Sequence, residues 1–348
     1  MFVARLGADT VAVERVVRDA RGLDVTLVTR VPTTQRTEAR LDLDADGRML
    51  AFTSETRGAG GEAVRAVRMT RDGDSLRVGD GTSTRALAAG PDALPFVEYA
   101  HAPFDLALRR GTDGTLPMAT GRSVLDFTVT RDGRTATVRH PFRGPMAVTL
   151  GPDGGLATLD AAETTRKLVV TRAPGFDVDA FQRRAAALDA AGRGIGPLSG
   201  RAEAQSAVAG AEITVDHGQP SLRGRQVWGT VVPYGRVWRT GADRATHLTT
   251  SRPLVFGRGA DAVRVPAGTV TLFSVPEADG GVLVVNGQTG QNGNAYDPAR
   301  DLGRVPFELD ALAEPVERLE IVAEPDGDGG RLVVRWGDQT RSVPFRVE

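Results

Sequence analysis

The chain has 348 residues, of which 41% are hydrophobic and 25% charged, and its formal net charge is -1. This length predicts two domains, and the balanced charge argues against a nucleic-acid partner, which would favour a concentrated basic face. The chain has no cysteine, which excludes disulfides, thiolate nucleophiles and Cys-ligated metals. We expect no transmembrane segment, because no apolar run approaches the ~18 residues that would span a bilayer.

The first half of the chain has the pattern of an antiparallel β domain. Runs of alternating apolar and polar residues fill residues 2–90 and return at 123–172. Asp-Gly pairs at 46–47, 72–73 and 80–81 separate such runs and suit the positive φ angles of two-residue hairpin turns. We therefore expect residues 1–172 to form a half-barrel or curved antiparallel sheet.

A short helix is predicted between these two blocks, in the stretch LPFVEYAHAPFDLALRRG (94–111). Pro103 suits its first turn and Gly111 its end. Such a segment could plug one end of the curved sheet. Its aromatic side chains Phe96, Tyr99 and Phe104 have two interpretations: plain core, which we favour, or the lining of a hydrophobic-ligand cavity.

The chain changes character at residues 173–204, which we expect to be a linker between two domains. Asp177 or Asp179 can cap a helix that carries Phe181, Ala185 and Leu188 on one face and stops at Gly192. A Gly/Pro/Ser-rich stretch follows at 192–200. Residues 205–348 then show nine short strand-like runs, among them RQVWGTVV (225–232), which predict an antiparallel β-sandwich. The fold class is all-β.

The stretch YGRVWRTGADRATH (234–247) holds most of the chemically distinctive residues. We expect a turn and an ordered loop in which Trp238 packs into the sandwich and Arg239 is held by a carboxylate or by loop carbonyls. Asp243 could instead orient the imidazole of His247. GxSxG, P-loop, HExxH and GxGxxG motifs are all absent.

A second loop, 286–304, contains oxygen-bearing side chains around glycines. Asp and Asn oxygens could hold a hard cation such as calcium, although the spacing does not fit an EF-hand and the same residues make ordinary Asx turns. We favour turns, and so expect neither a metal nor a cofactor. The candidate ligand- or partner-binding residues of the two loops are Trp238, Arg239, Asp243, His247, Asn286, Tyr296, Asp301 and Arg304.

Three blocks of residues 205–348 resemble the DUF2911 family, a bacterial family of unknown function. They are GRQVWGTVVPYGRVWRTGADRATHLTT, VPAGTVTLFSVPE and NGQTGQNGNAYDPARDLGRVPFEL. The resemblance implies a compact β domain, usually exported, without an established reaction or cofactor. The N-terminal half resembles the β-rich extension found in some members from high-GC soil bacteria.

The chain departs from this family's pattern at several positions. Asp243 replaces an Asn, while His217, Gly281 and Asn292 replace a Tyr and two Trp. If the family's aromatic residues form a binding platform, this chain has lost much of it.

Three functions follow from these patterns. The first is a non-catalytic binding or structural module, periplasmic or secreted, that binds an unknown protein or small ligand through the two loops. The second is a hydrolase that uses Asp243 and His247, with Arg239 or Arg304 as an anion clamp. The third is a hydrophobic-ligand carrier built on the N-terminal β domain. We favour the first and leave a cytoplasmic location open. A dry cavity under Tyr99 and Phe104 would favour the third.

Overall fold

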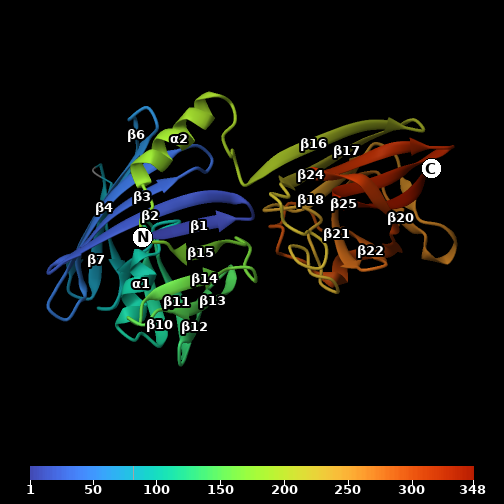
Figure 1. Cartoon of the computed structure of the whole chain (residues 1–348). Helices are drawn as coiled ribbons and strands as arrows, with labels where there is room; N and C mark the ends of the chain where they lie inside the picture. Colours follow the sequence, from blue (N-terminus) through green and yellow to red (C-terminus); the bar gives the residue numbers. More distant parts are fainter. Residues whose placement is uncertain (81) are drawn as a thin grey trace. The chain divides into compact units, whose positions relative to one another are not determined.

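The computed structural model describes residues 1–80 and 82–348. It is mostly β-structure and divides into two compact units, Met1–Pro197 and Leu198–Glu348, whose elements are labelled in Figure 1. The predicted all-β class is confirmed, with two α-helices in the described chain. No helix of the described residues is long and apolar enough to cross a membrane.

Unit 1 is built on one sheet of fifteen strands. The strands are β1 (Phe2–Leu6), β2 (Asp9–Asp19), β3 (Gly22–Thr29), β4 (Gln35–Leu43), β5 (Met49–Gly58), β6 (Ala63–Asp72), β7 (Ser75–Gly79), β8 (Thr84–Ala88), β9 (Leu94–Pro95), β10 (Gly114–Ala119), β11 (Val124–Asp132), β12 (Thr135–His140), β13 (Gly144–Leu150), β14 (Leu156–Asp160) and β15 (Val169–Arg172).

The order of these strands divides the sheet into two wings, one from β1 to β8 and the other from β15 to β9. It runs β8-β7-β6-β5-β4-β3-β2-β1-β15-β14-β13-β12-β11-β10-β9, so the first and last strands of the unit pair in the middle. Neighbouring strands are antiparallel throughout except that β9 pairs parallel with β10. The Asp-Gly pair at 72–73 turns the β6–β7 hairpin with Gly73 at φ 57°, whereas the turn predicted at 80–81 includes a residue outside the described ones.

Helix α1 (Ala102–Arg109) confirms the predicted helix of the 94–111 stretch. Pro103 lies in its first turn and Gly111 follows its end at φ 78°. Two buried carboxylates hold the helix. Glu14 accepts hydrogen bonds from the backbone N–H of His101 (2.7 Å) and Ala102 (3.0 Å), which would otherwise be unpaired donors at the helix start.

The second carboxylate, Asp105, ties α1 to the sheet from within the helix. It accepts from the backbone N–H of Leu156 at 2.7 Å and forms ion pairs with Arg18, Arg109 and Arg172. These contacts reach both wings, because Arg18 is in β2 and Leu156 is in β14. The helix and the chain before it are therefore fixed against the face of the sheet that both wings share.

Helix α2 (Val178–Ala190) confirms the helix predicted within 173–204. Asp177 caps it by accepting from Ala180 N at 2.9 Å. Val178 and Phe181 pack against valines of β1, β2 and β3, and Asp189 accepts from Thr34 N at 2.6 Å. The helix thus belongs to unit 1, and residues 199–204, which we expected in the linker, form the start of β16.

Unit 2 contains a six-stranded sheet, β16-β17-β18-β21-β22-β23, and a four-stranded sheet, β20-β19-β25-β24. The elements are β16 (Ser199–Val208), β17 (Ala211–Pro220), β18 (Thr246–Thr250), β19 (Leu254–Phe256), η1 (Gly259–Asp261), β20 (Val263–Val265), β21 (Gly268–Glu277), β22 (Gly280–Asn286), η2 (Pro298–Arg300), β23 (Asp301–Pro306), β24 (Glu308–Asp326) and β25 (Gly329–Val347).

One hydrophobic core unites these two sheets, with buried residues such as Ile213, Leu272, Leu283, Ile321 and Val334. Because both sheets contribute to the same core, the unit is a β-sandwich. Our prediction of a strand for RQVWGTVV (225–232) was wrong, because the structure has a loop there. Gly229 turns it at φ 80° and Val232 N bonds back to Val227 O at 2.9 Å.

Candidate functional site

The loop 234–247 of unit 2 is anchored along strand β21. Gly235 N donates to Pro276 O at 3.0 Å, and Trp238 exchanges two backbone hydrogen bonds with Ser274, at 2.7 and 2.8 Å. The indole N–H of Trp238 donates to Gly241 O at 3.0 Å. The loop therefore pairs with β21 through its backbone, as a short additional strand would.

Trp238 completes a cluster with the other two tryptophans of the chain. Its ring stacks on Trp336 with centroids 6.1 Å apart and meets Trp228 edge-on at 5.8 Å. The guanidinium of Arg341 lies 4.2 Å from the centroid of Trp228. Such aromatic pairs add to the energy of area burial, so the expected packing of Trp238 into the sandwich is confirmed.

Arg239 has a different partner from the one we expected. Its Nη1 donates to the side-chain amide oxygen of Asn294 at 2.6 Å, in place of a carboxylate or a backbone carbonyl. Burial lowers the pKa of Arg239, while the charge of Asp243 acts in the opposite direction. Arg239 therefore links the two loops through an amide.

The role expected for Arg239 is filled by Arg341, which is 1% exposed. Its guanidinium donates to the backbone oxygens of Gly280 and Glu277 and to the amide oxygen of Gln339. Burial lowers the pKa of Arg341. The sequence offered no local signal for this role, since Arg341 lies in a polar stretch of a long strand.

The structure does not bring Asp243 and His247 together as a catalytic pair. Asp243 is exposed in the left-handed region, at φ 60°. His247 is in β18, where its Nε2 accepts from Gly290 N at 3.3 Å. No hydrogen bond joins the two side chains in the part of the chain that the structure describes, so this geometry gives the hydrolase hypothesis no support.

Four other candidate residues form one hydrogen-bonded group at the base of the 286–304 loop. The buried amide of Asn286 donates to Asp297 O and to Asp301 Oδ1, both at 2.9 Å. The hydroxyl of Tyr296 donates to Asp301 Oδ2 at 2.6 Å and accepts from Arg304 at 3.0 Å. The oxygens that could have served a cation thus hold the loop together.

Gly281 and His217, two of the positions at which the sequence departs from the DUF2911 pattern, lie in closely packed surroundings. Gly281 is at φ 80°, and a Cβ there would lie 2.1 Å from Val275 O, so this backbone has no room for an aromatic side chain. His217 is 2% exposed, with its Nε2 3.4 Å from Leu319 O. Asn292 forms an isolated bridge with Arg244. The two loops are therefore joined by backbone pairing as well as by side chains.

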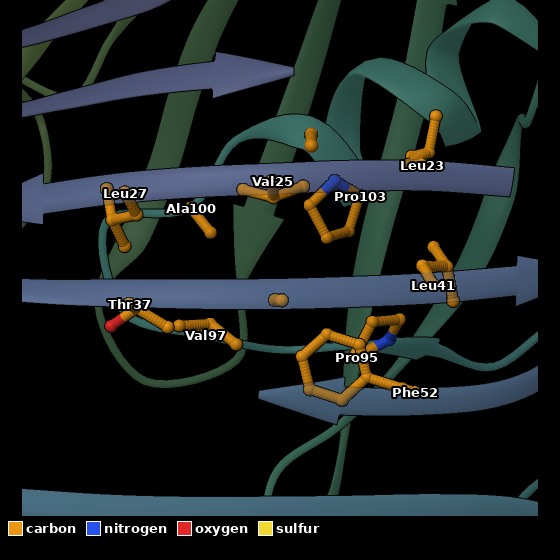
Figure 2. Close-up of a pocket in the computed structure, with 12 residues that line it drawn as sticks. Leu23, Val25, Leu27, Thr37, Leu41, Phe52, Pro95, Val97, Ala100 and Pro103 are labelled. Carbon is orange, nitrogen blue, oxygen red and sulfur yellow. The ribbon is translucent and has the colours of Figure 1, made fainter. Parts of the chain in front are cut away.

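In unit 1, the chain before α1 crosses the sheet and leaves a hollow on each side of it. The hollow against β3, β4 and β5, named the aliphatic cavity, has a volume of ≈ 20 Å³. Figure 2 shows Leu23, Val25 and Leu41 facing Pro95 and Pro103 across it. Because its walls are almost wholly apolar, this cavity offers no polar partner to a ligand.

The second hollow, named the aromatic cavity, has a volume of ≈ 60 Å³. Phe104 meets Phe127 edge-on with centroids 5.4 Å apart, and Phe127 meets His140 at 4.7 Å. Both cavities share the wall residues Val97 and Ala100. The remaining side chains around the aromatic cavity include Phe96, Tyr99, Met146, Leu159, Ala161, Leu168 and Val170.

A charged group lies at one part of the aromatic cavity's wall. Both terminal nitrogens of Arg143 donate to the carboxylate of Glu98, at 2.9 and 3.1 Å. Arg166 contacts the same carboxylate at 3.1 Å and donates to the hydroxyl of Tyr99 at 3.2 Å. Burial raises the pKa of Tyr99, which is held at φ 66°. Two cations therefore share one anion at this wall.

His140 adds an unpaired polar atom to the same cavity. Its Nδ1 accepts from the backbone N–H of Phe142 at 3.1 Å, whereas its Nε2 is buried without a hydrogen-bond partner among the described residues. Burial, with the nearby Arg143, lowers the pKa of His140 to about 4. The ring is therefore neutral at pH 7.

Sequence reasoning named Phe96, Tyr99 and Phe104 here but missed Phe127, His140, Arg143 and Arg166. The missed residues come from β11, β12 and the turns after β12 and β14, far from the helix in the chain. Alternation along β12 does put Val138 and His140 on one face. It does not tell which face a cavity occupies.

The fold and the sites define a protein of two β units. One unit contains two cavities, and the other contains two loops joined by hydrogen bonds. Residues 199–345 match the family described as "Protein of unknown function (DUF2911)". The resemblance read from the three sequence blocks is thus confirmed for this part of the chain. No curated protein matches the chain.

A solved structure is also similar to part of the chain. It is the crystal structure of a DUF1089 family protein from Pseudomonas aeruginosa, with 16% sequence identity and a TM-score of 0.35. The match covers 43% of this chain and 90% of that one.

Proposed function

We propose that the protein is a non-catalytic binding protein whose unit 1 holds a small apolar ligand in the aromatic cavity. The observation that carries this proposal is a hollow of ≈ 60 Å³ that is lined mostly by apolar and aromatic side chains, among them Tyr99 and Phe104. A void costs stability because its lining atoms lose dispersion contacts. Apolar cavity surface accepts the apolar part of a ligand.

The position of the cavity also supports binding. The segment between β9 and α1 separates it from the aliphatic cavity only by Val97 and Ala100, which line both. Neither residue is in a helix or strand, and the hydrogen bond from Ala100 N to Val97 O, at 3.0 Å, forms a turn between them. A ligand longer than one cavity could extend into the other.

Titration calorimetry of the full chain with 1-octanol tests the proposal, because this probe is neutral and flexible. Ala161→Leu places a larger side chain in the cavity wall, and we expect it to weaken binding by tenfold or more. Ala162→Leu is the matched control, since Ala162 is the exposed neighbour. Equal binding by both variants, or no binding by the unchanged chain, would contradict the proposal.

A periplasmic or secreted location remains a proposal that rests on the family resemblance. Immunodetection of the native protein in fractionated cells of its source organism tests it. Recovery in the cytoplasmic fraction alone would contradict it.

The two loops of unit 2 support a second, structural role. Arg239 bonds to Asn294, and Asn286 bonds to Asp301, so these side chains join the loops to each other. We propose that this region is a scaffold, on which any partner would contact exposed residues such as Asp243. A pull-down with an Asp243→Arg variant, compared with the unchanged chain, would detect such a partner.

A further inference from the structure

We propose that the ligand of the aromatic cavity carries a carboxylate head, bound by His140 Nε2–H together with the arginine pair Arg143 and Arg166. This inference rests on the proposed function and specifies the chemistry of its ligand. It follows from three features of the cavity: an unpaired donor in its wall, an excess of positive charge in its wall, and its limited volume.

The unpaired donor is the Nε2–H of His140. Because Nδ1 accepts a hydrogen bond from Phe142 N, the proton of the neutral ring is on Nε2. This N–H lines the aromatic cavity in a residue that is 6% exposed, and it has no partner in the described part of the chain. An unmade hydrogen bond of a buried donor is costly. A ligand oxygen at this place would remove that cost.

The charge excess comes from Arg143, Arg166 and Glu98. The two guanidiniums share one carboxylate, which leaves one positive charge in a partly buried wall. A monoanionic head balances this charge, whereas an ammonium head adds to it. Both terminal nitrogens of Arg143 already donate to the carboxylate of Glu98. This two-nitrogen geometry is one that an Arg side chain can form and a Lys side chain cannot.

The volume limits the tail of the ligand. A water needs roughly 10–15 Å³ of such volume, so the ≈ 60 Å³ of the aromatic cavity holds a short chain. The ≈ 20 Å³ beyond Val97 and Ala100 adds room for little more. The two volumes together hold about five to eight groups the size of a water, so we infer a monocarboxylate whose acyl chain has no more than about eight carbons.

Three probes of equal chain length test the head group on the full chain, namely octanoate, 1-octanol and octylammonium. We expect calorimetry at pH 7 to show octanoate binding at least tenfold more tightly than the other two. Equal affinity for octanoate and 1-octanol would overturn the head-group inference and leave the proposed function intact. Failure of all three to bind would overturn both.

Two variants and one control locate the head. His140→Phe keeps an aromatic ring and removes the donor, and we expect it to lower octanoate affinity about tenfold while leaving 1-octanol unchanged. The N–H of the exposed Phe142 can then bond to water. Arg166→Gln should lower octanoate affinity similarly and provides an independent result if His140→Phe fails to fold.

The matched control is Arg139→Gln. Arg139 is exposed on β12 beside His140 and on the other face of the strand, so its charge is close in sequence but lies away from the cavity. Octanoate affinity should stay within twofold. A loss in Arg139→Gln equal to that in Arg166→Gln would show a general charge effect and overturn the inference.

Discussion

The aromatic clusters of the two units pack differently. In unit 2, Trp228, Trp238 and Trp336 fill the space between the sheets, with Trp238 and Trp336 stacked at 15°. In unit 1, Phe104, Phe127 and His140 meet edge-on around a cavity. The difference lies in the elements that cover the inner face of each sheet.

Unit 2 closes its core with a second sheet, whose side chains interdigitate with those of the first. Unit 1 closes with a short helix, held by Glu14 and Asp105, and with an irregular segment, held by the contacts of Arg143 and Arg166 with Glu98 and Tyr99. A segment without regular side-chain spacing cannot fill a curved surface uniformly. Aromatic residues alone therefore do not indicate a binding site.

The two units can be contrasted in this way only if each folds independently, and limited proteolysis tests that condition. Trypsin should cut after Arg193, which is exposed beyond the end of α2, in preference to Arg201, which lies in β16 and pairs with Asp216 at 2.7 Å. The released C-terminal fragment contains all three tryptophans. Its fluorescence spectrum should match that of the intact chain, and a red-shifted spectrum would show that unit 2 does not fold alone.

Among point substitutions, Trp336→Ala should have the largest effect on stability. Removing a fully packed Trp costs about 4 kcal/mol, measured as the free energy of unfolding of unit 2 in urea by the fluorescence of the other two tryptophans. Phe96→Ala beside the cavity should cost unit 1 only about 2 kcal/mol, because Phe96 is already partly exposed. Equal losses would mean that the two clusters are packed alike.

Arg341→Met should follow, at about 3 kcal/mol, because it leaves the buried carbonyl oxygen of Gly280 and the partly buried one of Glu277 without their donor. Arg239→Met should cost only about 1 kcal/mol, since its partner Asn294 is exposed and can bond to water. The control Arg346→Met, at an exposed position, should change stability by less than about 0.5 kcal/mol. A larger loss at Arg239 than at Arg341 would reverse our assignment of the structural arginine.

A further expected effect is the pH dependence of unit 1 that His140 causes. Its pKa is about 4 in the folded chain against an ordinary 6.5, so between these values the unfolded chain binds a proton that the folded chain does not. Stability is therefore full above pH 6.5 and falls towards pH 4, by on the order of 2 kcal/mol.

The groups that face His140 are Arg143 and Arg166, which lower its pKa, and Glu98, which raises it. His140→Phe should remove this part of the pH dependence when unfolding of unit 1 is followed by far-ultraviolet circular dichroism. Persistence of the full slope in this variant would assign it to other groups.

The sequence by itself predicted the class and most local structure correctly. Alternation predicted the strands, Asp177 and Gly192 bounded α2, and Pro103 marked the start of α1, because these signals depend on the backbone of a few adjacent residues. It also placed Trp238 in the core. It was wrong about 225–232, where the turn at Gly229 overrides a β-like composition.

Only the tertiary structure decided which polar residues act together. Arg239 bonds to Asn294, fifty-five positions away, and Arg341 to a turn sixty-one positions away. His140 lines the same cavity as Phe104 and Leu159 through separate strands and a helix. A residue's neighbours in sequence determine its backbone preference, but burial and hydrogen-bond partners depend on strand order and on how the sheet is covered. For that reason the cavity, its unpaired donor and its charge could be found only in the folded chain.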